Sequence, residues 1–299
     1  MFAVAFLYLC FTGMMFLGSL LLSQNHFPFF VAGARFFIAG VILLAIYISK
    51  HKHSTLKQLP QLMCMSFLKY SFCLYTLSAI GFSFGMQYAD PVKACFIFVL
   101  SPFITSLFLY FLYGEKLSLK KKYGLTIGFF AIIPIILDSG HGQLSDVPWH
   151  LSIFGYFAFA CAVTSFAYGW ILSKDMHKTV HLPSTLITGA AFLVGGGINL
   201  LIFILMYGFS IGSMQFTDDF WWLLLLFSIL TAVSYNLYSS LLKRYSPTFI
   251  SFASFLEPAF GLLYASIFLG QTISNAALIA LSTLGFGLYL FYQEELRLQ

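Results

Sequence analysis

A single carboxylate interrupts an apolar run near the end of the chain, in the stretch SFLEPAFG at residues 254–261. The run extends from Pro247 to Phe268, and Glu257 is its one charged residue. Counted from Pro247, Glu257 lies about 15 Å along a helix, which is the middle of a bilayer. Three roles are open for it: proton carrier, counter-ion for a cationic substrate group, or structural partner of Arg35 or of a hydroxyl group.

Other candidates are polar side chains inside apolar stretches. Arg35 could clamp a carboxylate or phosphate with two hydrogen bonds, or pair with backbone carbonyls or Glu257 as a structural residue. Lys93 lies near the end of its stretch, where it could reach the outer surface or attract an anion at the entry side. We expect further substrate-binding or coupling residues among Ser101, Tyr75, Tyr168, Tyr235 and Asn236.

Proline directly follows two of these candidates, Pro102 after Ser101 and Pro258 after Glu257. Proline lacks a backbone donor and clashes with the carbonyl four residues earlier, so it kinks a helix and frees that carbonyl. The carbonyl freed by Pro258 would belong to Ser254. Two kinked helices with polar residues at the kinks predict a central cavity.

The composition places all of these residues in a membrane protein. Hydrophobic residues make up 60% of the chain, charged residues 8%, and the mean hydropathy is +0.90, which lies outside the range of soluble domains. Ten apolar stretches are long enough to cross a hydrocarbon core. They are residues 2–22, 29–48, 68–86, 91–113, 122–138, 149–172, 183–207, 219–242, 247–268 and 273–293. The expected fold is an all-α polytopic membrane protein.

The basic residues predict the orientation. With a cytoplasmic N-terminus, all 15 lysines and arginines except Arg35 and Lys93 fall on the inner side, and the outer loops contain none. This is the distribution that the positive-inside rule requires, so we expect both termini in the cytoplasm. The lysine run at 120–122 suits anionic lipid headgroups rather than nucleic acid. Trp149, Trp221 and Trp222 fit an outer interfacial belt, and Trp170 could belong to the inner one.

Familiar signatures of enzymes are missing from the sequence. It has no Walker A, HExxH or GxSxG pattern, so ATP-driven transport and common hydrolase chemistry have no support. The five cysteines lack metal-ligand spacing and read as packing residues. We therefore expect no enzymatic activity, no metal and no cofactor.

An internal repeat divides the chain. Residues 91–118 align without a gap on residues 247–274, and the alignment matches Pro91 with Pro247, Pro102 with Pro258 and Gly114 with Gly270. The sequence therefore predicts two five-helix halves, residues 1–138 and 149–293. Because five is odd, the second half must cross the membrane in the opposite sense, and inverted repeats of this kind are typical of secondary transporters.

The same residues carry a family resemblance. The segment GMQYADPVKACFIFVLSPFITSLFLYFLYGEKLSLKKKYGLTIGF (85–129) resembles the end of an EamA-type half in the drug/metabolite transporter superfamily. The stretch SFLEPAFGLLYASIFLGQTIS (254–274) resembles the family's Glu-Pro helix, and ARFFIAG (34–40) resembles its second helix. The sequence departs from the pattern at Gln271, where the family has glutamate, and at Pro134 and the cluster LVGGGINL (193–200). The resemblance implies ten helices, cytoplasmic ends and transport activity.

These observations predict a secondary active transporter of a bacterial inner membrane, working by alternating access on a small polar metabolite. Opposite charges at Arg35 and Glu257 suit a zwitterion such as an amino acid or a derivative of one. Within the resembled superfamily, amino-acid export and S-adenosylmethionine uptake both occur. The alternatives are a lipophilic-cation or drug exporter and a non-transporting membrane partner or sensor subunit. Coupling to a proton or to a counter-substrate stays open.

Overall fold

The computed structural model describes residues 2–24, 27–51, 62, 64–88, 97–98, 100–138, 148–208, 219–269 and 275–298. Within these ranges the chain forms helices and turns and no strand, which confirms the all-α prediction. Four of the described helices are long and apolar enough to cross a membrane. They are α2 (Pro28–Lys50), α9 (Trp149–Thr179), α10 (Ser184–Tyr207) and α11 (Phe220–Leu241).

The other elements fall in the remaining predicted apolar stretches. They are α1 (Phe2–Gln24), α4 (Met65–Ser71), the π-helical segment η2 (Phe72–Leu77), α5 (Ser78–Tyr88), α7 (Ser101–Tyr113), α8 (Leu119–Asp138), α12 (Pro247–Ala253), α13 (Leu256–Leu269) and α14 (Asn275–Leu298). Two predicted stretches are thus divided: 68–86 holds three consecutive elements, and 247–268 holds two.

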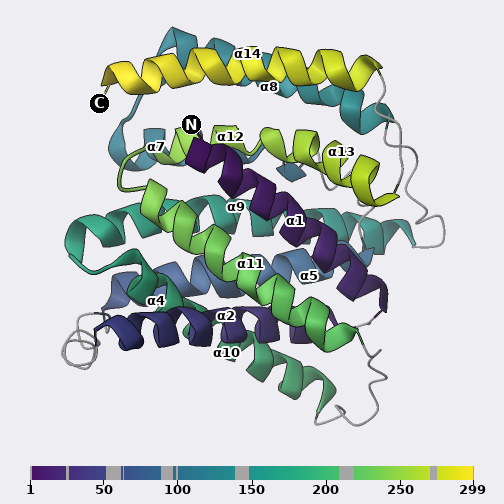
Figure 1. The fold of residues 1–299 in the computed structure, drawn as a ribbon, viewed down its shortest axis with the longest axis vertical. Helices are drawn as coiled ribbons and strands as arrows, with labels where there is room; N and C mark the ends of the chain where they lie inside the picture. The colour runs from purple at the N-terminus through teal and green to yellow at the C-terminus, as the bar shows by residue number, and fades with distance from the viewer. Residues whose placement is uncertain are drawn as a thin grey trace.

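The helices pack in pairs that join the first part of the chain to the second. In Figure 1, α8 and α14 lie side by side at the top, α2 and α10 lie at the bottom, and α1 and α11 run diagonally side by side between these two pairs. Helix α5 packs along α9. In chain order, α1, α2, α5 and α8 correspond to α9, α10, α11 and α14. Replacing each helix by its counterpart turns the pair α5–α9 into α11–α1 and leaves the pairs α2–α10 and α8–α14 as they are. The packing therefore has the symmetry of two similar halves.

Glycines allow the close approach of α2 and α10. A Cβ atom on Gly196 would lie 2.6 Å from the backbone nitrogen of Phe37 and 3.0 Å from the carbonyl oxygen of Gly33. Further along the same contact, a Cβ on Gly40 would lie 3.0 Å from the carbonyl oxygen of Gly189. Small residues that let helix backbones approach are typical of membrane helix packing. Within the cluster at 193–200, which departs from the family pattern, Gly196 therefore serves this contact, and Gly195 lies against Tyr75.

Gly196→Ala is expected to destabilise the protein by about 2 kcal/mol, because the new methyl group meets backbone atoms that cannot move aside. Gly197 offers a matched control, since a Cβ there meets nothing within 4 Å. Gly197→Ala should leave stability unchanged or raise it slightly, because alanine favours helix more than glycine does. Thermal unfolding of the two variants in detergent checks this, and equal melting temperatures would contradict it.

A buried ionic junction joins α8, α14 and the start of α12. Lys121 Nζ lies 2.7 Å from Glu295 Oε2, and the two side chains are 9% and 5% exposed. The same carboxylate accepts hydrogen bonds from the Ser246 backbone N–H at 2.6 Å and the Ser246 hydroxyl at 2.9 Å. The Ser246 hydroxyl in turn caps α12 by accepting a hydrogen bond from the Phe249 N–H.

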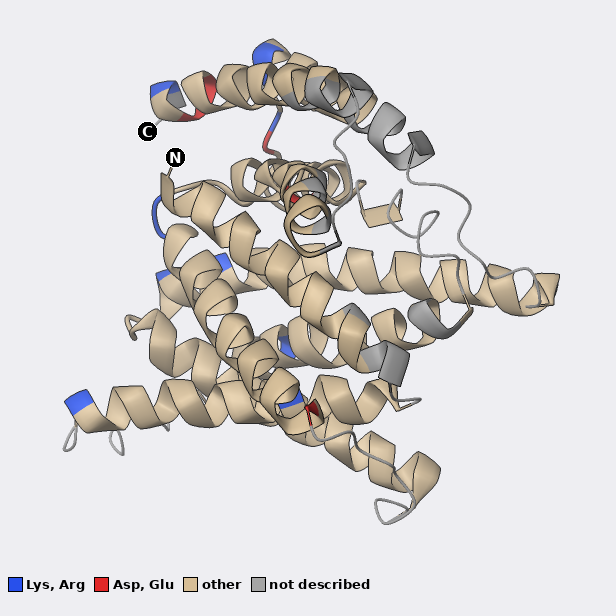
Figure 2. Cartoon of the chain, turned by 45° about the vertical axis from the view of Figure 1, so that its right-hand side comes forward, with Lys and Arg blue, Asp and Glu red and all other residues tan. Residues whose placement is uncertain are grey.

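Charged residues are rare in the described helices, as Figure 2 shows.

Candidate functional site

The helix that carries Glu257 is interrupted just before it. Helix α12 ends at Ala253, Ser254 and Phe255 form a turn, and α13 begins at Leu256. The Ser254 carbonyl, which Pro258 was expected to free, accepts a hydrogen bond of 2.8 Å from the Glu257 backbone N–H. Glu257 lies in the first turn of α13, where the helix dipole favours a negative charge.

The equivalent helix of the first half begins at the equivalent place. Helix α7 starts at Ser101, with Pro102 in its first turn. The carbonyl of Leu100 accepts hydrogen bonds of 3.0 Å from the backbone N–H groups of Phe103 and Ile104. Ser101 and Glu257, which are partners in the internal repeat, thus both stand at the N-terminal end of a helix.

These two helix starts meet at one small cavity of about 10 Å³, which is close to the room that one water molecule needs. It is far smaller than the roughly 300–1,000 Å³ typical of small-molecule sites, so the cavity would have to widen to admit a metabolite. Five aromatic residues, three serines and one carboxylate line it: Tyr8, Phe11, Phe98, Phe166, Tyr238, Ser101, Ser251, Ser254 and Glu257. Tyr8 is held in place by a 2.5 Å hydrogen bond from its hydroxyl to the carbonyl of Ile250.

Glu257 has no ion-pair partner in the part of the chain that the structure describes. The ion pairs there join Lys121 to Glu295 and Lys178 to Asp175. The pair between Arg35 and Glu257, which was one of the structural roles considered for both residues, is therefore not formed in this conformation. The hydroxyl of Thr12 contacts Glu257 only through the backbone carbonyl, at 3.4 Å. The cavity thus contains a carboxylate without a countercharge.

Arg35 lies between two aromatic rings. Its guanidinium carbon is 4.4 Å from the ring centroid of Phe36 and 4.7 Å from that of Phe227, which is favourable cation–π geometry. Its buried Nε atom makes no hydrogen bond to the described residues. A guanidinium with an unused donor could bind a carboxylate.

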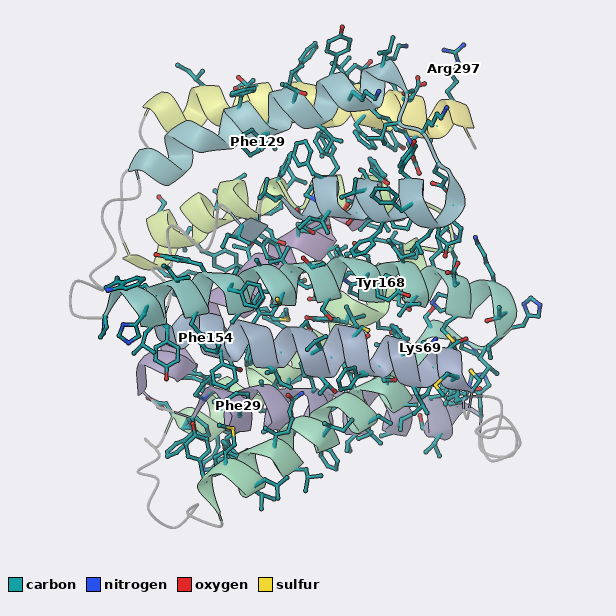
Figure 3. All side chains as sticks on the ribbon, turned by 180° about the vertical axis from the view of Figure 1, so that it is seen from behind. Phe29, Lys69, Phe129, Phe154, Tyr168 and Arg297 are labelled. Atoms are coloured by element: carbon teal, nitrogen blue, oxygen red, sulfur yellow. The ribbon has the colours of Figure 1, made fainter. Side chains whose placement is uncertain are left out.

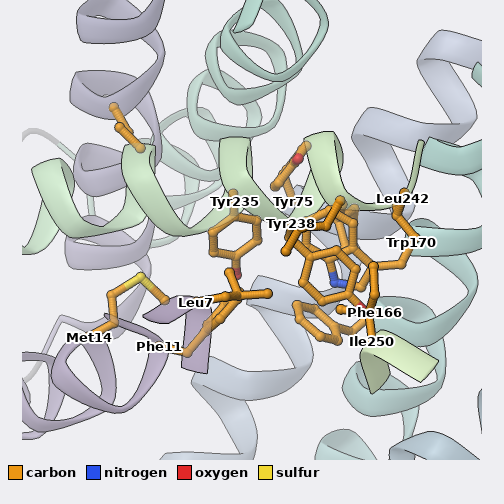
Figure 4. Close-up of a cluster of buried hydrophobic side chains, with 14 of the residues drawn as sticks. Leu7, Phe11, Met14, Tyr75, Phe166, Trp170, Tyr235, Tyr238, Leu242 and Ile250 are labelled. Atoms are coloured by element: carbon orange, nitrogen blue, oxygen red, sulfur yellow. The ribbon is translucent and has the colours of Figure 1, made fainter. Parts of the chain in front are cut away.

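Tyr235 lies in a buried aromatic cluster (Figure 4). The ring centroids of its neighbours lie 5.3–6.4 Å from its own; the neighbours are Phe11, Phe36, Tyr75, Phe166, Trp170 and Phe192. Tyr75 belongs to this cluster and shares a 2.7 Å hydrogen bond with the hydroxyl of Tyr70.

Trp170 differs from the sequence expectation. It is 1% exposed and stacks on Tyr238 with ring centroids 3.6 Å apart, so it supports the cavity wall and does not belong to an interfacial belt. Sequence reasoning also missed Tyr8 and Tyr238. Tyrosine is frequent in this chain, and no spacing distinguishes a tyrosine that lines the cavity from one that faces lipid.

A π-helical segment positions Tyr75. Carbonyl groups of η2 receive hydrogen bonds from two other helices: Asn199 Nδ2 donates to the Tyr75 carbonyl and Ser165 Oγ to the Cys73 carbonyl, each at 2.8 Å. Such segments are frequent at functional sites. Asn199 Nδ2 also donates to the Gly195 carbonyl of its own helix at 2.8 Å. Asn199 had a recognisable signal in the sequence, because strongly polar side chains are rare inside long apolar stretches.

The remaining predicted site residues lie elsewhere. Tyr168 packs on Phe108 with ring centroids 5.3 Å apart, on the face seen in Figure 3. Asn236 accepts a hydrogen bond from Ser240 at its backbone carbonyl. Of the predicted site residues that the structure describes, Ser101 and Glu257 line the cavity, whereas Arg35, Tyr75, Tyr168, Tyr235 and Asn236 do not. Lys93 and Gln271 lie outside the described residues, and so does the side chain of Pro258.

Comparison with known proteins gives several relatives over most of the chain. It is 27% identical over 284 residues to the "S-adenosylmethionine/S-adenosylhomocysteine transporter" of Chlamydia trachomatis, covering 90% of this chain and 82% of that protein. It is 24% identical to a "Probable amino-acid metabolite efflux pump" of Escherichia coli, covering 89% and 86%. It is 26% identical to the "Uncharacterized inner membrane transporter YedA" of Escherichia coli, covering 88% and 81%.

A solved crystal structure has the same fold, with a TM-score of 0.78 at 18% identity over 99% of this chain and 97% of the other. The model of the EamA-like transporter family matches residues 1–137 and residues 153–293. The chain therefore belongs to the EamA-like transporter family of the drug/metabolite transporter superfamily, and it is a multi-pass transporter of the inner membrane.

Proposed function

We propose that this transporter carries a small zwitterionic metabolite of the S-adenosylmethionine type across the membrane. One observation carries the proposal: the Glu257 carboxylate faces an aromatic cavity that supplies no countercharge. Aromatic faces and a carboxylate attract a cationic centre, and the rings could stack a planar base. Arg35, with an unused donor on its guanidinium, would take the substrate carboxylate. The printed names of the relatives support this substrate class.

We further propose that the ten predicted helices form two inverted halves, residues 1–138 and 149–293, with both termini in the cytoplasm. The exchange symmetry of the helix pairs and the loop charges support this arrangement. Transport would then proceed by alternating access, with one half rocking against the other around a fixed site. The N-terminal ends of α7 and α13 reach that site from the two halves, and Ser101 and Glu257 would contact the substrate from them.

A lipophilic-cation exporter is the second candidate. The same cavity favours it, because five aromatic residues and a carboxylate are sufficient to bind an apolar cation. The two candidates differ in what they require of Arg35. A zwitterion carrier needs Arg35 for the substrate carboxylate, whereas a cation exporter should tolerate its loss.

Uptake into liposomes tests the proposal. Purified protein should give saturable flux of one zwitterion from a panel of amino acids, S-adenosylmethionine and nucleosides, and Glu257→Gln should abolish that flux. The substitution keeps the shape of the side chain and removes its charge. Flux of the zwitterion that is equal in wild type and variant would remove Glu257 from the site, and flux of lipophilic cations alone would favour the second candidate.

A further inference from the structure

We propose that Trp170 separates the central cavity from a second, polar compartment, lined by Ser173, His177 and Thr188, through which the substrate passes to the cytoplasmic side. The observation that carries this is a stacked aromatic pair at the cavity wall with unpaired polar atoms behind it. The direction of passage rests on the proposed function, which places this end of α9 in the cytoplasm.

One face of α9 presents polar atoms to the interior of the bundle. Trp170, Ser173 and His177 follow one another at spacings of three and four residues, so they lie on one side of the helix. Trp170 Nε1, Ser173 Oγ and His177 Nδ1 are buried and have no hydrogen-bond partner among the described residues. The polar surface therefore runs from Trp170 toward the end of α9 at Thr179.

A hydroxyl from α10 adds a second wall. Thr188 is fully buried, and its Oγ1 is also without a hydrogen-bond partner in the part of the chain that the structure describes. The hydroxyls of Ser173 and Thr188 both approach that of Tyr70 but complete no hydrogen bond with it. The Tyr70 hydroxyl shares its 2.7 Å hydrogen bond with Tyr75 instead. Hydroxyl groups from α4, α9 and α10 are therefore gathered at one place, and two of them are unpaired.

These unpaired hydroxyls differ from the other buried hydroxyls of the bundle. Serine and threonine inside a helix usually bond to the preceding turn, as Thr105, Ser228 and Thr231 do, with 2.7–2.9 Å hydrogen bonds to the carbonyls four residues earlier. Ser173 and Thr188 make no such bond. A buried donor that stays unpaired is unfavourable. A conformation in which water or the polar groups of a substrate reach these hydroxyls would satisfy them.

An aromatic pair closes this compartment off from the cavity. Tyr238 lines the cavity, and Trp170 stacks on it with ring centroids 3.6 Å apart and ring planes 12° apart (Figure 4). Next to the pair, His177 Nε2 shares a 2.7 Å hydrogen bond with the hydroxyl of Ser239, the residue that follows Tyr238. Moving α11 away from α9 would part the rings and connect the cavity, which has to widen for transport, with the unpaired hydroxyls.

Cysteine substitution tests whether the compartment opens. Ser173→Cys is expected to react with a membrane-impermeant methanethiosulfonate reagent added to the cytoplasmic face of membrane vesicles, although residue 173 is fully buried in this structure. Ser228→Cys is the matched control, because Ser228 is equally buried but its hydroxyl is paired within α11. Mass spectrometry of the labelled peptides measures each site separately from the native cysteines. A minor open population should make residue 173 react at least about tenfold faster than residue 228.

Trp170 variants test the barrier itself. Trp170→Ala should accelerate the reaction at residue 173 by about a further tenfold, because the closed arrangement loses its ring stack and the open population grows. Trp170→Phe keeps a ring and should leave the rate near that of the protein with Trp170. A melting temperature and a rate at residue 228 that stay unchanged distinguish opening from unfolding. If Trp170→Ala unfolds, the rates with Trp170 and with Trp170→Phe decide the outcome.

The remaining outcomes separate this compartment from the proposed function. Reaction at residue 173 that is no faster than at residue 228 overturns the inference, and so does labelling from the outer face alone. Cytoplasmic labelling of residue 173 without flux of any zwitterion into liposomes leaves the compartment standing and removes the proposed substrate class. Flux of S-adenosylmethionine without labelling of residue 173 overturns the compartment and leaves the proposed function standing.

Discussion

Arg35→Gln is expected to weaken binding of the zwitterionic substrate by about tenfold to a hundredfold, because charge-assisted hydrogen bonds contribute roughly 1.5–3 kcal/mol. The guanidinium carbon lies 4.4 Å from the ring centroid of Phe36 and 4.7 Å from that of Phe227, and its Nε atom has no hydrogen-bond partner among the described residues. Arg35→Lys keeps the charge but loses the flat, two-pronged geometry, and it should restore only part of the affinity. Binding titrations of the three proteins measure this order.

A purely structural Arg35 would give a different pattern. The melting temperature of Arg35→Gln would then fall while the affinity of the remaining folded protein stayed the same. Thermal unfolding should therefore be measured on the samples used for binding. A lipophilic cation serves as the second ligand, and its affinity should not fall in Arg35→Gln. Loss of both ligands to the same extent would contradict the assignment of Arg35 to the substrate carboxylate.

Lys121→Met is expected to destabilise the protein by about 3–5 kcal/mol, because it leaves the buried carboxylate of Glu295 without its cation. Lys178→Met provides the control. Lys178 also forms an ion pair, with Asp175 at 3.8 Å, but its side chain is 63% exposed, and such pairs contribute about 0–1 kcal/mol. Melting temperatures in detergent should fall strongly for Lys121→Met and little for Lys178→Met.

The junction should also lose stability in acid. Glu295 lies just beyond the predicted span that ends at residue 293. Burial by itself raises the pKa of Glu295, but the hydrogen bonds from Lys121 and Ser246 outweigh it and hold the pKa below its ordinary value of 4.5. A lowered folded-state pKa means that the contribution is fully present above about pH 4.5 and is lost as the pH falls through the lowered value. The stability difference between wild type and Glu295→Gln should therefore shrink below pH 4.5, and a difference that grows in acid would contradict this.

Much of the fold class was predictable because it depends on the composition of the chain and on the length and spacing of its apolar stretches. Long apolar stretches without charges can bury their backbone polar groups in lipid only as helices or closed barrels, and lengths near 20 residues favour helices. The internal repeat was visible in the sequence from the spacing of prolines and glycines such as Pro102 and Pro258, and the two inverted five-helix halves that it predicts stay a prediction. The division of the ninth stretch into α12 and α13 was less accessible, because a proline predicts a kink near itself but not the residue at which the helix stops.

The site was only partly accessible for a related reason. Glu257 and Arg35 were identifiable from sequence because a charge inside an apolar stretch is unfavourable and therefore rare. Trp170 and Tyr238 gave no such signal, since aromatic residues make up 19% of the chain and most of them suit lipid as well as a cavity. Tyr168, Tyr235 and Asn236 had the expected chemistry, but they do not line the cavity.

The sequence by itself determined that this protein is a helical membrane transporter, which residues are charged inside the membrane, and that Ser101 and Glu257 occupy equivalent positions in the repeat. Only the tertiary structure decided that these two residues share one cavity, that Arg35 faces aromatic rings and forms no ion pair with Glu257, and that Lys121 meets Glu295 across 174 positions of the chain. The physical reason is the range of the interactions. Hydrophobicity and helix period act over a few turns, whereas a cavity depends on which helix faces meet, and that depends on close contacts such as those of Gly196 with α2.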